Sequence, residues 1–244
     1  MKSRLDVLLV ERGIAPSREK ARAWIMAGLV LVDEVEVSKA GAKIDGEASI
    51  RLREGALRKY VGRGGLKLEG ALEDFDVEVE GRICADLGAS TGGFTDCLLQ
   101  RGAARVYAVD VGYGQLAWKL RQDERVVVME RTNARHLESL PEPIGLVVGD
   151  LSFISLTKVL PAVRRIAAPG ADCVLLVKPQ FELGPKNVGR GGRVSDPAAR
   201  ARAVQAVLAD AVALDFEALG HAESRLPGAK AGNIEHLVWL RASE

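Results

Sequence analysis

Hydrophobic residues recur at helical spacing near the start of the chain and at strand spacing soon afterwards. The spacing over residues 5–9 predicts a short amphipathic helix that stops at Gly13. A second stripe over 21–25 predicts a helix with Ser17 as its N-cap and Gly28 at its end. Short β-rich runs complete a predicted α+β domain of residues 1–60, with strands at 29–32, 35–37 and 49–52.

The rest of the chain, residues 61–244, alternates β-rich apolar runs with helical patterns. A basic, glycine-rich stretch at about 58–65 is typical of an interdomain linker, and a helix opens near Lys67. Helices are predicted at 156–167 and 197–213. The alternation predicts an α/β fold with a parallel, doubly wound sheet. Its strands are expected at 83–87, 106–109, 126–129, 146–148, 173–177 and 236–240.

Composition narrows the class of protein. Hydrophobic residues make up 48% of the 244 and charged residues 27%, which is enough apolar surface for a core and enough charge for solubility. No apolar run reaches the roughly 20 residues of a membrane helix, and the start lacks a signal-peptide pattern, so we expect a cytoplasmic protein without membrane contact. Cys84, Cys97 and Cys173 are expected to be reduced packing residues, and no metal is implied.

The net charge of +1 is unevenly distributed. Residues 1–60 carry 12 Lys and Arg against 9 Asp and Glu, whereas the remainder carries 22 against 24. Arg18 and Arg22 lie one helical turn apart and off the apolar stripe, with Lys20 between them. From charge alone, a solvated helix face and an RNA-binding face are equally good interpretations.

A glycine-rich loop follows the strand predicted at 83–87. Glycines let the backbone approach a ligand closely, and a new helix offers unpaired N–H groups. About twenty residues later a strand ends at Asp110, whose carboxylate can accept hydrogen bonds from ribose hydroxyls. The pattern indicates an adenosine-bearing cofactor and leaves a dinucleotide, S-adenosylmethionine and a tight structural turn as alternatives.

Four charged residues are expected at the carboxyl ends of the strands. Asp150 and Lys178 each follow a predicted strand, Glu235 precedes the last strand, and Lys67 opens the first helix of the domain. A lysine acts as a general base when its surroundings bring its pKa toward the operating pH. Each residue taken singly is more simply interpreted as an ordinary surface charge.

The front domain resembles a known RNA-binding domain. Arg4-Leu5-Asp6, the run from Ser17 to Arg22 and Gly28-Leu29-Val30 are similar to the small domain named after a small-subunit ribosomal protein, although Asp33-Glu34 replaces the usual Asn-Gly or Asp-Gly hairpin turn. That resemblance implies RNA binding through Arg4, Arg18, Lys20 and Arg22.

The loop from Asp86 to Phe94 resembles the first motif of methyltransferases rather than a dinucleotide fingerprint. The resemblance implies S-adenosylmethionine as cofactor, with Asp110 holding its ribose. Asn133 is expected to contact the adenine, or else to be a turn residue. The methionine end would be lined by Asp86, Gly88, Ala89, Ser90, Thr91, Gly92, Gly93 and Phe94.

The Lys67, Asp150, Lys178, Glu235 order resembles the FtsJ class of RNA ribose methyltransferases. Together with long motifs at 62–67, 88–94, 111–116, 150–156 and 177–182, it is similar to the TlyA family over nearly the whole chain. The resemblance implies cytidine 2′-O-methylation in ribosomal RNA, with Lys178 as base, Asp150 orienting it, and Lys67 and Glu235 positioning the ribose. No Pro-Pro motif of amine methylation and no Pro-Cys motif of carbon methylation occurs here.

Two other classes of function remain as alternatives. A non-catalytic RNA-binding or ribosome-assembly factor would keep the fold without the reaction, and a haemolysin is suggested by a label used in the family. The sequence offers no amphipathic toxin helix for the second. The short tail after the last strand resembles family members that modify only the large subunit, so large-subunit RNA is expected, free or within the ribosomal subunit. The sequence does not indicate an oligomeric state.

Overall fold

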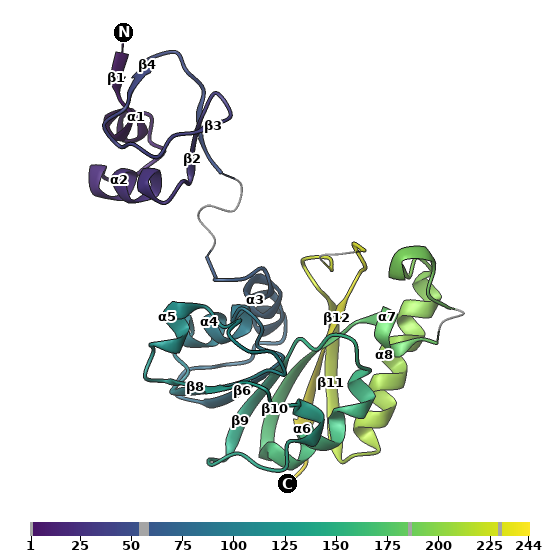
Figure 1. Cartoon of the computed structure of the whole chain (residues 1–244). Helices are drawn as coiled ribbons and strands as arrows, with labels where there is room; N and C mark the ends of the chain where they lie inside the picture. Colours follow the sequence, from purple (N-terminus) through teal and green to yellow (C-terminus); the bar gives the residue numbers. More distant parts are fainter. Residues whose placement is uncertain (1, 54–58, 185–186, 229–230) are drawn as a thin grey trace. The chain divides into compact units, whose positions relative to one another are not determined.

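The chain folds into two compact units. The computed structural model describes residues 2–53, 59–184, 187–228 and 231–244, and it divides into Met1–Arg58 and Lys59–Glu244 (Figure 1). Each unit has a hydrophobic core of its own. The boundary falls close to the one expected from the sequence.

The front unit packs two helices against short antiparallel strands. Both predicted helices form, as α1 (Leu5–Glu11) and α2 (Arg18–Met26), and the Ser17 hydroxyl caps α2 by accepting from the Lys20 backbone N–H at 3.2 Å. The three predicted strands form one sheet with β2 in its centre. The pair β1–β4 was not predicted from the sequence. The strands are β1 (Lys2–Arg4), β2 (Val30–Val32), β3 (Val35–Glu36), β4 (Lys43–Asp45) and β5 (Ile50–Leu52).

The β2–β3 hairpin forms despite its unusual turn residues. Asp33 and Glu34 have φ of 47° and 67°, the left-handed region that Asn-Gly adopts more easily. Contacts with the neighbouring strand offset that cost. Asp33 accepts a hydrogen bond from the Ser49 backbone N–H at 2.9 Å, and Glu34 pairs with Arg51. The turn is therefore held by tertiary contacts rather than by residue preference.

Asp6 is a buried charge that joins the first strand to the second helix. Its side chain has no exposed surface, and its two carboxylate oxygens accept hydrogen bonds from Arg4, while Arg18 donates a further one at 3.0 Å. The hydrogen bond from Arg4 is the main reason that the pKa of Asp6 falls to about 2. Two residues predicted to bind RNA thus also stabilise the front unit.

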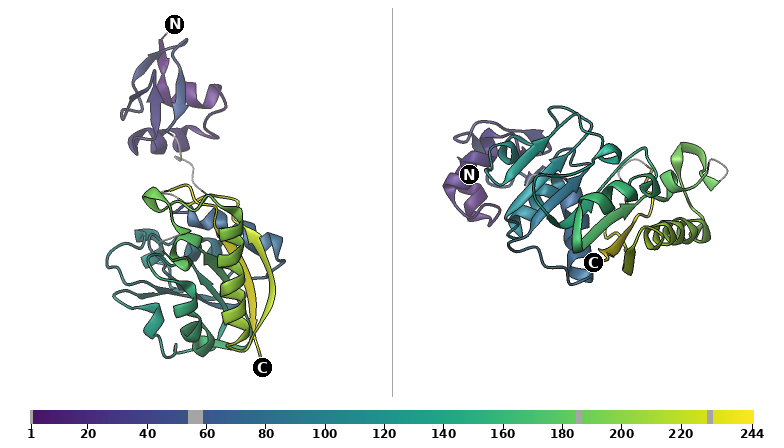
Figure 2. Two further views of the ribbon diagram at one scale, coloured as in Figure 1. Left: turned by 90° about the vertical axis from the view of Figure 1, so that its right-hand side faces the viewer. Right: turned by 90° about the horizontal axis from the view of Figure 1, so that it is seen from below.

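The second unit is a sheet of seven strands covered by helices on both faces (Figures 1 and 2). Its strands are β6 (Ile83–Leu87), β7 (Arg105–Val109), β8 (Val126–Met129), β9 (Ile144–Gly149), β10 (Ala167–Val177), β11 (Phe216–Glu223) and β12 (His236–Ala242). Its longer helices are α3 (Gly64–Asp74), α4 (Gly93–Gln100), α6 (Leu160–Ile166) and α8 (Pro197–Val212). Its short helical turns are α5 (Trp118–Arg121), η1 (Ala134–His136), η2 (Leu156–Lys158), α7 (Pro179–Glu182) and η4 (Arg190–Gly192).

One strand of this sheet runs against the others. The order is β11-β12-β10-β9-β6-β7-β8, and β12 pairs antiparallel with both β10 and β11. The Rossmann-like α/β fold is confirmed, but the sheet is mostly parallel, rather than parallel throughout as expected from the sequence. The described residues between β11 and β12 form no helix that could serve as a crossover, and β12 returns antiparallel beside β11. The sequence analysis also missed β11.

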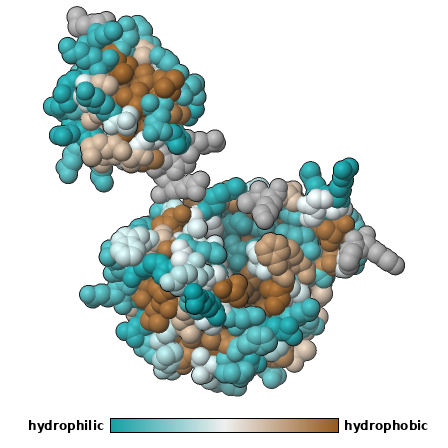
Figure 3. Space-filling model, in the orientation of Figure 1, coloured by the Kyte–Doolittle hydropathy of each residue, from teal (hydrophilic) through white to brown (hydrophobic). Residues whose placement is uncertain are grey.

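Side chains alternate between two cores on opposite faces of the sheet. Within β10, Cys173 and Leu175 join the core covered by α6 and α8, whereas Val174 and Leu176 join the core covered by α3 and α4. This period of two is the pattern expected for strands buried on both faces. Outside these cores, the visible surface mixes hydrophilic side chains with hydrophobic patches (Figure 3).

Cys84, Cys97 and Cys173 are buried, and none of them forms a disulfide among the described residues.

The stretch predicted to be a linker, residues 58–65, is largely part of the second unit. Arg58 lies outside the described residues, but Tyr60 is only 3% exposed and the Val61 backbone N–H donates to Asp96 of α4 at 2.8 Å. Gly64 and Gly65 already belong to α3. A Cβ on Gly65 would collide with the Tyr60 ring. The glycines of this stretch therefore allow α3 to pack closely against its surroundings and do not form a free linker.

We predict that Asp6→Asn destabilises the front unit by about 2 kcal/mol, because it removes charged hydrogen bonds to two arginines. Since the folded pKa of Asp6 lies below the usual 3.8, its contribution is present above that value and is lost as the pH falls toward 2. Urea unfolding of residues 1–58, followed by the fluorescence of Trp24, measures both effects. The exposed control Glu11→Gln should match wild type. Equal stability and equal acid sensitivity in Asp6→Asn would contradict the prediction.

Candidate active site

The reversed strand brings four charged residues to one edge of the sheet. Asp150 follows β9 and Lys178 follows β10, both at the carboxyl ends of their strands. Val177 pairs with His236 across the antiparallel β10–β12 ladder, so Glu235 lies near Lys178. Lys67, from α3, lines the same cavity of about 400 Å³. Its described lining comprises Lys67, Asp150, Ser152, Phe153, Lys178, Gln180, Phe181, Gly191, Gly192, Gly228, Ala231, Asn233 and Glu235.

The four charges form two ion pairs. Lys67 Nζ lies 2.5 Å from Glu235 Oε2, and Lys178 Nζ lies 2.5 Å from Asp150 Oδ1. Lys67, Lys178 and Glu235 are each less than 9% exposed, so little water screens these charges. Each lysine faces a carboxylate, and the four charges sum to zero. The arrangement is therefore two compensated pairs rather than a cluster of cations.

A serine that the sequence analysis did not single out completes the contacts of Lys178. The lysine Nζ donates a hydrogen bond to Ser152 Oγ at 2.8 Å. Ser152 lies in the loop after β9, two residues beyond Asp150. The sequence signal that could have found Ser152 was a hydroxyl side chain two residues after Asp150. A turn after the end of a strand directs neighbouring residues back toward the same edge of the sheet.

A second set of contacts holds the loop after β9 against the segment after β10. The Glu182 carboxylate accepts hydrogen bonds from Ser155 Oγ at 2.6 Å and from the Leu156 backbone N–H at 2.8 Å. Burial raises the pKa of Glu182. The rings of Phe153 and Phe181, from the same two segments, have centroids 5.4 Å apart, and Phe153 is 80% exposed. The two loops thus form one connected wall.

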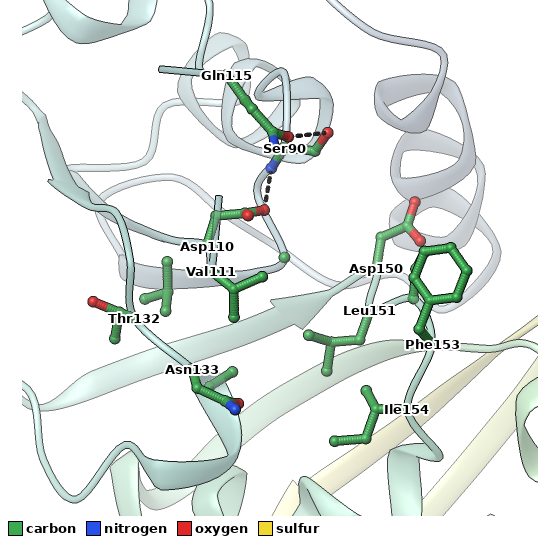
Figure 4. Close-up of a pocket in the computed structure, with 14 residues that line it drawn as sticks. Ser90, Asp110, Val111, Gln115, Thr132, Asn133, Asp150, Leu151, Phe153 and Ile154 are labelled. Atoms are coloured by element: carbon green, nitrogen blue, oxygen red, sulfur yellow. Dashed lines mark hydrogen bonds between the residues drawn. The ribbon is translucent and has the colours of Figure 1, made fainter. Parts of the chain in front are cut away.

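A second cavity, of about 480 Å³, opens beside the first at the ends of β6, β7 and β9 (Figure 4). Asp110 lies on one side of it, with Oδ2 accepting from the Ser90 backbone N–H at 2.8 Å and Oδ1 from the Gly112 backbone N–H at 2.6 Å. Each oxygen keeps a further lone pair for a ligand hydroxyl. The lining comprises Gly88, Ser90, Val109, Asp110, Val111, Gln115, Thr132, Asn133, Ala134, Asp150, Leu151, Ser152, Phe153 and Ile154.

Two glycines of the loop after β6 are required by its close packing. Gly88 has φ of 85°, and a Cβ there would lie 2.8 Å from the Asp150 carbonyl oxygen. Gly92 has φ of 95° and forms the N-terminus of α4, where a Cβ would collide with Leu120. Both positions therefore need glycine for conformation and for space. The loop after β6 is therefore a tight structural turn, and it also borders the second cavity.

The other predicted cofactor residues are placed differently. Asp86 is fully buried below the loop, where Oδ2 accepts from the Thr95 backbone N–H and hydroxyl at 2.9 and 2.7 Å. It does not line the cavity, contrary to expectation, and its burial raises its pKa to about 7. Of the loop, Gly88 and Ser90 line the cavity, whereas Ala89, Thr91, Gly92, Gly93 and Phe94 are absent from its described lining.

Asn133 is a turn residue and also lines the cavity. Its side-chain oxygen caps the turn η1 by accepting from the Arg135 backbone N–H at 3.0 Å. Because the oxygen makes the cap, the amide nitrogen of the side chain is a donor group near the cavity. A capping residue and a ligand contact are compatible at this position.

The four basic residues predicted to bind RNA are exposed to solvent, and two of them also form ion pairs. Arg4 and Arg18 contact Asp6, yet their side chains remain 49% and 59% exposed. Lys20 and Arg22 are exposed on α2, next to Arg18. This helix therefore presents three cations to solvent from the same unit.

Two further properties concern the described part of the chain. Within residues 2–53, 59–184, 187–228 and 231–244, no group of three or more His, Cys, Asp or Glu side chains is arranged to hold a metal ion. Among the helices formed by these residues, none has the length and apolar character needed to cross a membrane.

Comparisons with known proteins agree with this geometry. Residues 60–242 match the FtsJ-like methyltransferase model, and residues 3–50 match the S4 domain. The chain is 52% identical to the 16S/23S rRNA (cytidine-2′-O)-methyltransferase TlyA of Mycobacterium tuberculosis, over 98% of this chain and 90% of that one. It is 41% identical to Hemolysin A of Brachyspira hyodysenteriae, over 96% and 98%.

A solved structure from Streptococcus thermophilus that carries the hemolysin name is also similar. It is 45% identical, covers 100% of this chain and 89% of its own, and superposes with a TM-score of 0.75. The family match spans the whole catalytic unit, including both cavities and the two ion pairs. The chain therefore belongs to the FtsJ-like methyltransferase family, with an S4 domain in front of the catalytic unit.

Proposed function

We propose that this protein transfers a methyl group from S-adenosylmethionine to the 2′-hydroxyl of a cytidine in ribosomal RNA. The observation that carries the proposal is the two neighbouring ion pairs, Lys67–Glu235 and Lys178–Asp150, beside a second cavity that suits an adenosine cofactor. The acceptor and the RNA class follow the name of the M. tuberculosis relative.

The second cavity has the donors and acceptors that S-adenosylmethionine needs. Asp110 has free lone pairs for ribose hydroxyls, and Asn133 lies where the adenine would sit. A cavity of about 480 Å³ is within the range of small-ligand sites. When bound, the cofactor supplies an electrophilic methyl group, and its sulfur keeps the electron pair of the broken S–C bond.

The first cavity would hold and activate the acceptor ribose. Lys178, when neutral, accepts the proton of the 2′-hydroxyl as the oxygen forms its bond to the methyl carbon. Asp150 holds the lysine in place and stabilises its charge after the proton has moved. Lys67 and Glu235 offer a donor and an acceptor to the neighbouring ribose hydroxyls. The role of each of the four residues follows the family resemblance, and the two ion pairs support it.

The front unit would bind RNA phosphates through its exposed cations. Arg4, Arg18, Lys20 and Arg22 are available on one small unit, and such contacts supply affinity without reading sequence. This division leaves the choice of nucleotide to the catalytic unit and places general RNA affinity in the S4 domain.

Incubation of the protein with radioactive S-adenosylmethionine and separated ribosomal RNAs or subunits tests the proposal. Label is expected in ribosomal RNA, and large-subunit RNA is the predicted acceptor. Tight cofactor binding without methyl transfer to any of these substrates would instead support a non-catalytic RNA-binding or assembly factor. Failure to bind the cofactor would contradict the proposed methyltransferase function.

We predict that Lys178→Ala lowers methyl transfer by about 10²-fold or more, because a general base contributes at least this much. Cofactor affinity should stay within a few-fold of wild type, since Lys178 lines the acceptor cavity and not the cofactor cavity. Single-turnover rates and calorimetry measure the two effects. The exposed control Lys158→Ala should retain wild-type activity. Substantial turnover in Lys178→Ala would remove it from the role of base.

We predict the opposite pattern for Asp110→Ala. The variant loses two backbone hydrogen bonds and the acceptor for the ribose, so cofactor binding should weaken by roughly 1–3 kcal/mol. Calorimetric titration with S-adenosylmethionine measures the loss, and the exposed carboxylate variant Glu217→Ala is the matched control. Unchanged affinity in Asp110→Ala would show that another residue holds the ribose.

A further inference from the structure

Three residues border both cavities. Asp150, Ser152 and Phe153 line the cavity assigned to the cofactor and also the cavity assigned to the acceptor. A methyl group that passes from one cavity to the other must therefore cross near this short segment. Asp150 already has a proposed role, and Phe153 has no group that can exchange a proton. Ser152 is the remaining polar group at the crossing.

Ser152 contacts the proposed base directly. Its Oγ accepts a hydrogen bond from Lys178 Nζ at 2.8 Å, while Asp150 Oδ1 lies 2.5 Å from the same nitrogen. Lys178 is 8% exposed, so few water molecules can take over these contacts. Both partners of the lysine come from the loop that follows β9.

The loop that carries Ser152 is fastened beyond the serine as well. Glu182, four residues after Lys178, binds Ser155 and the Leu156 backbone N–H. The ring contact between Phe153 and Phe181 lies between the two sets of contacts. With both ends of the loop joined to the segment that carries Lys178, the serine oxygen has a fixed place relative to the lysine nitrogen.

The tetrahedral geometry of the Lys178 nitrogen means that its contact with Ser152 affects the direction of its lone pair. A neutral lysine nitrogen has one bond to carbon, two N–H bonds and one lone pair. When one N–H is directed to Ser152 and the other is drawn toward Asp150, the lone pair has a single remaining direction. We propose that Ser152 is a positioning residue that orients the lone pair of Lys178 toward the ribose hydroxyl. The inference rests on Lys178 being the base of the proposed function.

The contact acts on the step that uses the lysine. Ser152 Oγ accepts from Lys178 Nζ. The charged groups that line the cavity with Lys178, among the described residues, are Lys67, Asp150 and Glu235, and none of them is altered by a change at Ser152. The rate of methyl transfer, and its rescue by a residue that keeps the hydroxyl, therefore report on this contact.

Single-turnover methylation of ribosomal RNA with Ser152→Ala tests the proposal. We expect the rate to fall roughly ten- to a hundredfold, because orientation of the base is lost. Ser152→Thr keeps the hydroxyl and should restore the rate. Cofactor affinity should stay within a few-fold.

Ser155→Ala is the matched control. It removes a hydroxyl from the same loop that binds Glu182 and not Lys178, so it should lower the rate less than Ser152→Ala does. A wild-type rate in Ser152→Ala, or a rate in Ser152→Thr as low as that of Ser152→Ala, would overturn the proposal. Failure of the proposed function is seen separately, as absent methylation by wild type or retained activity in Lys178→Ala.

Discussion

The antiparallel pairing of β12 with β10 is the constraint on which the active site depends. In a fully parallel sheet the start of the last strand would lie at the amino edge, a whole strand length from Lys178. Because β12 runs in reverse, its first residue pairs with the last residue of β10, and Glu235 reaches the carboxyl edge. The strand direction thus brings together residues far apart in the sequence and allows Lys67 to find a carboxylate partner.

Charge pairing offsets part of the cost of placing charges at this edge. An unpaired lysine or carboxylate at this depth would carry a large desolvation cost, and the partner in each pair offsets part of it. Pairing also fixes the side chains, since an ion pair with little exposed surface has few alternative arrangements. The contacts of Glu182 and Ser152 extend this order to the loop after β9. A rigid edge of this kind suits a reaction that needs an acceptor oxygen in line with a sulfur–carbon bond.

Much of this architecture could be predicted from local patterns. Apolar runs located the central strands, and the residues just after them, Asp110, Asp150 and Lys178, border cavities in the structure. Local patterns carry no information on strand direction, so the sequence analysis placed Glu235 at the correct edge while expecting a parallel sheet. For the same reason Asp86 was expected at the cavity, although packing buries it against Thr95. The glycines of 62–65 suggested a linker, whereas Gly64 and Gly65 begin α3 and Gly62 packs closely against Thr91 and Gly93.

The identity of the methylated atom tests the central claim most directly. Ribosomal RNA labelled by the purified protein can be digested to nucleosides and separated by liquid chromatography with mass spectrometry. The two ion pairs and the neighbouring cofactor cavity predict that the added methyl group is on ribose, so the label should appear as 2′-O-methylcytidine. Label found in a nucleoside methylated on its base would contradict the account, because the acceptor would then not be the hydroxyl that Lys178 is proposed to deprotonate.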